Sequence, residues 1–115
     1  MVQNVLTNNE ILAVKDIILE SVDCEKIYLF GSYAYGTQRD ESDYDLYVVL
    51  KDENQNPLFA EQCIYRNLSK REGQHTPIDI LAENRNKFYD LCSLPTKERK
   101  IVREGVLLYD NAGLA

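Results

Sequence analysis

The hydrophobic residues near the N-terminus repeat with the period of a helix. Apolar residues recur at spacings of three and four up to about Ser21, at Ile11, Val14, Ile18 and Val22. Thr7 and Glu10 have the spacing of a capping box, which predicts that the helix begins there. A second helical repeat follows Pro57 and ends near Lys70. Both stripes indicate helices that cover a core.

Short runs rich in β-branched and aromatic residues predict strands at 26–31, 43–50, 77–81 and 106–109. Two further helices are predicted at 84–92 and 96–104, separated by a break at Pro95, and Gly105 ends the second. A single helical turn is expected between Gly31 and Gly36. Since helices and strands alternate, we predict an α/β fold with one sheet.

Composition narrows the class of protein. The chain has 115 residues, enough for one domain over 1–115, and its 13 basic against 19 acidic residues give a net charge of −6. We therefore expect no direct nucleic acid binding and no membrane association, because both require a basic face. The sequence has no long apolar run and no signal peptide at its start, which favours a cytoplasmic protein.

The cysteines and the single histidine carry little chemistry in this interpretation. Cys24, Cys63 and Cys92 lie far apart, so we expect buried free thiols and no zinc site or disulfide framework. His75 lies in a polar, turn-like stretch with no second histidine to form a metal pair. Chemistry must be sought elsewhere.

The stretch from Gly31 to Leu46 is the informative one. Gly31 and Ser32 follow a predicted strand, and backbone amides at such a corner can hold phosphate oxygens. Gly31 and Gly36 have the glycine spacing of a P-loop, but Thr37 stands where that motif requires lysine. The acidic run also fails as a calcium loop, because Tyr47 and Val48 occupy later positions of that motif.

Three aspartates are candidate metal ligands. Asp43 and Asp45 are two apart at the head of a strand, so their side chains leave the same face, and we expect Leu46, Val48 and Leu50 to continue that face into the core. Asp79 is flanked by isoleucines, where a carboxylate requires a partner. If the two strands are neighbours, the three carboxylates converge and favour Mg²⁺ or Mn²⁺. Each aspartate taken alone also fits an ordinary turn, solvated or ion-paired residue.

Taken in order, these residues resemble the nucleotidyltransferases of the DNA polymerase beta superfamily, and specifically the minimal nucleotidyltransferases. The resemblance covers nearly the whole chain. It rests on Gly31-Ser32, Gly36, Ser42-Asp43-Tyr44-Asp45-Leu46, Ile78-Asp79-Ile80 and the C-terminal 101–110. It implies a nucleotidyltransferase fold, in which helices pack against a short mixed β-sheet.

The resemblance also implies an activity: Mg²⁺-dependent transfer of a nucleoside monophosphate, AMP from ATP, to a hydroxyl group. Asp43, Asp45 and Asp79 would be catalytic and would bind two Mg²⁺ ions, with Mn²⁺ as an alternative. The nucleotide would be bound by Gly31, Ser32, Gly36 and Ser42, with the first two on the terminal phosphates.

The implied partner is a HEPN-type toxin protein, for which this chain would be the antitoxin and whose hydroxyl would receive the AMP. The short chain favours an acceptor supplied by another protein or held across a homo-oligomer. One departure is Tyr35, where antitoxin members often carry an arginine that Arg39 would have to replace. Two alternatives remain: a nucleotidyltransferase acting on a small, antibiotic-like molecule, and a non-catalytic antitoxin that neutralises its partner by binding.

Overall fold

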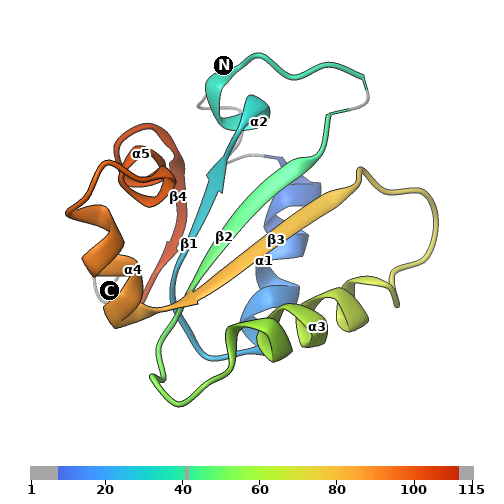
Figure 1. Ribbon diagram of the computed structural model, residues 1–115. Coiled ribbons are helices and arrows are strands. Elements are labelled where there is room, and N and C mark those ends of the chain that lie inside the picture. Colours follow the sequence, from blue (N-terminus) through green and yellow to red (C-terminus); the bar gives the residue numbers. More distant parts are fainter. Residues whose placement is uncertain (1–7, 41, 112–115) are drawn as a thin grey trace.

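The computed structural model describes residues 8–40 and 42–111, and its elements follow the predicted order (Figure 1). Four strands form one mixed sheet in the order β3-β2-β1-β4, in which β2 and β3 are parallel and the other pairs antiparallel. This confirms the predicted fold class. In chain order the elements are α1 (Asn9–Ser21), β1 (Cys24–Phe30), α2 (Ser32–Tyr35), β2 (Tyr44–Leu50), α3 (Pro57–Leu68), β3 (Ile78–Asn84), α4 (Arg85–Cys92), α5 (Lys97–Glu104) and β4 (Val106–Asp110).

Helices cover both faces of the sheet, and the two cores differ in character (Figure 1). The larger core lies under α1 and α3 and is mainly aliphatic. The smaller one, under α4 and α5, is centred on the aromatic rings of Tyr28, Tyr47 and Phe88. None of the described helices combines the length and apolar character that a membrane span requires.

The residues of β2 divide between these cores by strict alternation. Leu46, Val48 and Leu50 belong to the aliphatic core, whereas Tyr47 and Val49 belong to the aromatic one. The expectation that the three aliphatic residues continue the face of Asp45 is therefore wrong, because side chains one residue apart on a strand point to opposite faces. By the same rule, Asp45 lies on the face that α4 and α5 cover further along the sheet.

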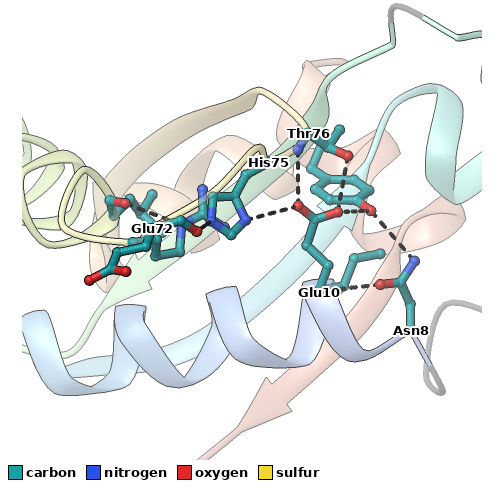
Figure 2. Close-up of polar contacts among 9 residues, drawn as sticks. Asn8, Glu10, Glu72, His75 and Thr76 are labelled. Atoms are coloured by element: carbon teal, nitrogen blue, oxygen red, sulfur yellow. Dashed lines mark hydrogen bonds and ion pairs between the residues drawn. The ribbon is translucent and has the colours of Figure 1, made fainter.

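The start of α1 differs from the predicted capping box. Asn8 is the N-cap, and its side-chain oxygen accepts a hydrogen bond from Ile11 N at 3.0 Å, while Thr7 lies outside the described residues. Glu10 instead accepts from the amide and hydroxyl of Thr76, at 2.9 and 3.0 Å, and from the Tyr44 hydroxyl at 2.9 Å (Figure 2). Asn8 thus caps the helix locally, and Glu10 takes part in a long-range network in place of the expected capping-box bond.

The cysteines are free thiols, as predicted. Cys24 is buried, and burial raises the pKa of its thiol to about 12. Cys63 and Cys92 are only partly buried, which corrects the expectation that all three are in the core.

Side chains of α3 cover the outer edge of β3. Ile80 N donates to the Tyr65 hydroxyl at 2.7 Å, and Ala82 N donates to Glu61 Oε2 at 2.9 Å. Glu61 and Tyr65 lie one helical turn apart, and their two targets lie two residues apart on the strand, so both outward-facing amides are satisfied. The edge of β3 is thereby closed, and α3 is fixed beside Asp79.

Candidate active site

Gly31 and Asp45 are in direct contact at the end of β1. Gly31 has φ +75°, and a Cβ atom at this position would lie 2.2 Å from Asp45 Oδ2. The positive φ and the lack of space both require glycine here. The Asp45 carboxylate is therefore packed against the backbone from which α2 begins.

Asp45 and Asp79 are register partners on the parallel strands β2 and β3. They start from neighbouring strands and share one face of the sheet, as predicted. Asp79 is exposed, and Asp79 Oδ1 accepts a hydrogen bond from the Tyr65 hydroxyl at 3.3 Å. Gly31, Asp45 and Asp79 thus form a row across three adjacent strands at one end of the sheet.

The electrostatics of this row favour a cation. Burial raises the pKa of Asp45, and the negative charges of Asp79 and Asp43 raise it further. Asp43 is exposed just before β2, and no three acidic, histidine or cysteine side chains of the described ranges are grouped closely enough to hold a metal ion alone. The structure thus brings together Asp45 and Asp79, with Asp43 close enough to act by charge. Two carboxylates with repelling charges fit Mg²⁺, which is commonly held by one or two carboxylates plus substrate phosphates.

The family model described as "Polymerase beta, Nucleotidyltransferase" matches residues 12–113, which is nearly the whole chain. This chain belongs to that family. The family is the one that the resemblance implied.

Relatives and solved structures agree with this assignment. A proposed protein adenylyltransferase, MJ1379 of Methanocaldococcus jannaschii, is 47% identical over 47 residues, which are 41% of this chain and 46% of that protein. The chain thus matches less than half of the length of this relative. The fold is similar to that of a proposed nucleotidyltransferase from Sulfolobus solfataricus, with TM-score 0.62, 18% identity and coverage of 96% of this chain and 84% of that one.

Two further neighbours are crystal structures of toxin-antitoxin proteins. One, solved with AMP-PNP, has TM-score 0.55 and 24% identity and covers 90% of this chain and 74% of that one. The other, a mutant of the toxin-antitoxin MntA-HpeT, has TM-score 0.54 and 23% identity and covers 85% and 71%. At these identities the two structures show a common fold.

The loop that joins α2 to β2 places the other residues predicted to bind nucleotide. Ser32 begins α2, and Gly36, with φ +76°, ends it. The Ser42 hydroxyl accepts from Arg39 N at 2.7 Å, and Ser42 N donates to Arg39 O at 3.0 Å. Ser42 therefore shapes the loop that leads into Asp43.

Tyr35, the departure from the antitoxin pattern, faces a lysine. Its ring lies 5.5 Å from Lys100 Nζ of α5, within the range of a cation–π contact. Arg39 is exposed. Lys100, from the C-terminal part of the chain, thus places a positive charge beside Tyr35. From the sequence, only Arg39 was considered as the source of such a charge.

Tyr65 is the other residue of this region that the sequence analysis missed. It reads as one more residue of an amphipathic helix, whereas its hydroxyl joins Asp79 and the edge of β3. A tyrosine near the C-terminal end of α3 is a signal, because its hydroxyl needs a hydrogen-bond partner. The sequence does not show that this partner lies on β3.

Proposed function

We propose that this nucleotidyltransferase transfers AMP from ATP to a hydroxyl group of a partner protein, and that this partner is a HEPN-type toxin for which the chain acts as antitoxin. The observation that carries the proposal is the row of Gly31, Asp45 and Asp79, in which a glycine corner and two carboxylates meet on adjacent strands. Phosphate and divalent cation need these two kinds of group side by side.

Each predicted site residue has a role in this proposal. The backbone at Gly31 and the Ser32 hydroxyl bind the terminal phosphates of ATP, and Gly36 and Ser42 maintain the loop that surrounds them. Asp43, Asp45 and Asp79 would hold Mg²⁺, as two ions, or Mn²⁺ in its place. Bound there, the metal would supply positive charge beside the phosphates. Lys100 adds positive charge on the Tyr35 side of the loop.

The transfer itself is a single displacement. The acceptor oxygen forms a bond to the α-phosphorus of ATP, and the bond from that phosphorus to the bridging oxygen of the β-phosphate breaks, so that pyrophosphate leaves. Asp79, exposed beside the acceptor, takes the hydroxyl proton and later releases it to water. No covalent intermediate on the protein is required.

Three of the similar proteins support a protein acceptor over a small molecule. MJ1379 is named for protein adenylylation, and two structural neighbours are toxin-antitoxin proteins, one of them solved with AMP-PNP. The fold and the family are shared with these proteins, and the acceptor and the nucleotide are our proposal.

The test mixes the purified chain with Mg²⁺, ATP labelled at the α-phosphate, and the HEPN protein encoded beside its gene. Label should enter the HEPN protein with release of pyrophosphate. Asp45→Asn should reduce the rate more than about 100-fold, since loss of even an indirect metal contact costs 10–100-fold. Glu104→Gln, an exposed change on α5, serves as the control.

Two outcomes would overturn the proposal. If Asp45→Asn neutralises the toxin as well as the wild type does, the chain acts by binding alone. If label enters aminoglycosides or other hydroxylated small molecules and not the HEPN protein, the small-molecule alternative is correct.

A further inference from the structure

An open pocket of about 280 Å³ lies beside Asp79, between the C-terminal end of α3 and the start of β3. Among its lining residues are Tyr65, Leu68, Arg71, His75, Pro77 and Ile78. Pockets that take drug-sized molecules measure about 300–1,000 Å³, so this one has room for a side chain. Its place next to Asp79 connects it to the proposed acceptor.

Tyr65 links the pocket to the candidate active site. Its side chain lines the pocket, and its hydroxyl donates to Asp79 Oδ1 at 3.3 Å. Ile78, which also lines the pocket, immediately precedes Asp79 on β3. A polypeptide segment that places one side chain in the pocket therefore brings its neighbouring residues to Asp79.

Arg71 gives the pocket its chemical preference. Its Nε atom donates to Leu68 O at 3.1 Å, but its Nη1 atom is buried and has no hydrogen-bond partner among the described residues. Buried polar atoms in native proteins nearly always have a partner, so an orphan guanidinium nitrogen at a pocket indicates a missing acceptor. Arginine binds a carboxylate through two parallel hydrogen bonds when two of its N–H groups are free to donate.

Glu10, an acidic residue that bonds to the pocket lining, already has several partners, and the charge of Arg71 also acts on it. Glu10 accepts from both polar atoms of Thr76 and from Tyr44, and His75 Nδ1 lies 3.6 Å from Glu10 Oε2 (Figure 2). Arg66 and Lys70, exposed at the same end of α3, make no ion pair within the described ranges. Arg66 and Lys70 thus add positive charge on the α3 side of the pocket, whereas Glu72 and Asp79 are the acidic residues that adjoin its lining in the sequence.

We infer that this pocket is the docking subsite for the acceptor polypeptide, and that it takes a glutamate or aspartate side chain adjacent to the hydroxyl that receives the nucleotide. The apolar stem of such a side chain packs on Leu68, Pro77 and Ile78, and its carboxylate meets Arg71. This inference rests on the proposed transfer to a protein hydroxyl.

The test uses the whole ¹⁵N-labelled chain and two synthetic peptides, one with tyrosine flanked by glutamates and one with glutamines in their place. We expect saturable shifts of the amides of Arg71, Thr76 and Ile78, and binding of the glutamate peptide about tenfold tighter, because its hydrogen bonds to arginine are charge-assisted. Arg71→Gln should make the two peptides bind equally. Equal binding of both peptides to the wild type would overturn the inference.

A second variant tests the place of binding. Ser69 also lines the pocket, so Ser69→Trp should fill it and abolish peptide binding, whereas Gln62→Trp, at an uncharged and exposed position of α3 outside the lining, should not. The amide spectra report whether each variant is folded. Peptide shifts that persist in Ser69→Trp would contradict the assignment.

Titration with Mg²⁺ and AMP-PNP separates the two proposals. Failure of the wild type to bind nucleotide would count against the proposed function, whereas nucleotide binding without peptide binding would remove only the docking subsite. Asp45→Asn should still bind the glutamate peptide.

Discussion

Glu98 is buried and Asp45 is partly buried, yet the surroundings of the two carboxylates are opposite in character. Glu98 is only 4% exposed, and its carboxylate accepts from the Tyr47 hydroxyl at 2.9 Å and lies 3.6 Å from the Lys97 ammonium. Asp45 faces two like charges and the backbone of Gly31, and in the described part of the chain its carboxylate has neither hydrogen bond nor ion pair.

The difference separates a carboxylate that supports the fold from one kept for a ligand. A buried carboxylate costs folding free energy unless its partners compensate for lost hydration. The partners of Glu98 belong to the protein itself, whereas a partner for Asp45 has to come from a bound ligand. The variants below test this contrast.

The largest effect is expected at the glycine that adjoins Asp45. Gly31→Ala should destabilise the protein by about 3 kcal/mol, because strain at a positive φ adds to overlap with the carboxylate. Gly73→Ala has a similar φ of +84° but nothing within 4 Å, so it should cost only about 1 kcal/mol. Urea unfolding measures both, and equal losses would mean that the contact with Asp45 is unimportant.

Removal of the supporting carboxylate comes next. Glu98→Ala leaves the buried Tyr47 hydroxyl without its acceptor, so we expect a loss of about 2 kcal/mol in unfolding free energy. Glu104→Ala, on the exposed side of the same helix, should change stability by less than about 0.5 kcal/mol. If Glu98→Ala were as stable as Glu104→Ala, Glu98 would not support the fold.

Removal of the charge at Asp45 should act in the opposite direction. In the absence of metal, Asp45→Asn should raise the unfolding free energy by about 0.5 kcal/mol, because it relieves repulsion from Asp79 and Asp43. Thermal unfolding in a chelating buffer measures the change. A clear loss of stability would show that Asp45 is a structural carboxylate like Glu98.

The smallest effects are those of pH. Burial raises the pKa of Glu10, but the hydrogen bonds from Thr76 and Tyr44 and the charge of Arg71 outweigh burial and lower this pKa below 4.5. The stability that Glu10 contributes is therefore present above pH 4.5 and is lost as the pH falls through the folded pKa. The raised pKa of Asp45 has the reverse sign, because its contribution is present below 3.8 and lost as pH rises through the folded value.

Urea unfolding from about pH 7 downward, on the wild type, Asp45→Asn and Glu10→Gln, distinguishes the two carboxyl groups. The advantage of Asp45→Asn should begin to shrink while the pH is still above 3.8, and the deficit of Glu10→Gln should persist below pH 4.5. An advantage that shrinks only below pH 3.8, or a deficit already lost at pH 4.5, would contradict the assigned directions.

The sequence was sufficient for the elements and for the row of site residues. Periodicity placed the helices and strands, and the motif from Gly31 to Asp45 identified the end of the sheet where Asp79 also lies. Local patterns determine these features, because the spacing of apolar residues and the position of glycine are set by the chain itself.

What the sequence did not predict depends on contacts between distant elements. Glu98 lies in a highly charged helix and reads as solvated, but it is buried, and its carboxylate accepts a hydrogen bond from Tyr47 of β2. The sequence predicted a local capping-box bond for Glu10, but in the structure Glu10 accepts hydrogen bonds from Tyr44 and Thr76. Tyr65 and Lys100 reach the site region only once the fold brings α3 and α5 to it.

The closed edge of β3 also limits how other chains can associate with this protein. Exposed strand edges promote sheet extension between molecules, which leads to strand addition by partners or to aggregation. Since Glu61 and Tyr65 occupy the amides of Ala82 and Ile80, a peptide near Asp79 cannot bind there as an additional strand. Recognition on that side must proceed through side chains, and strand-to-strand growth is directed to β4 at the opposite edge.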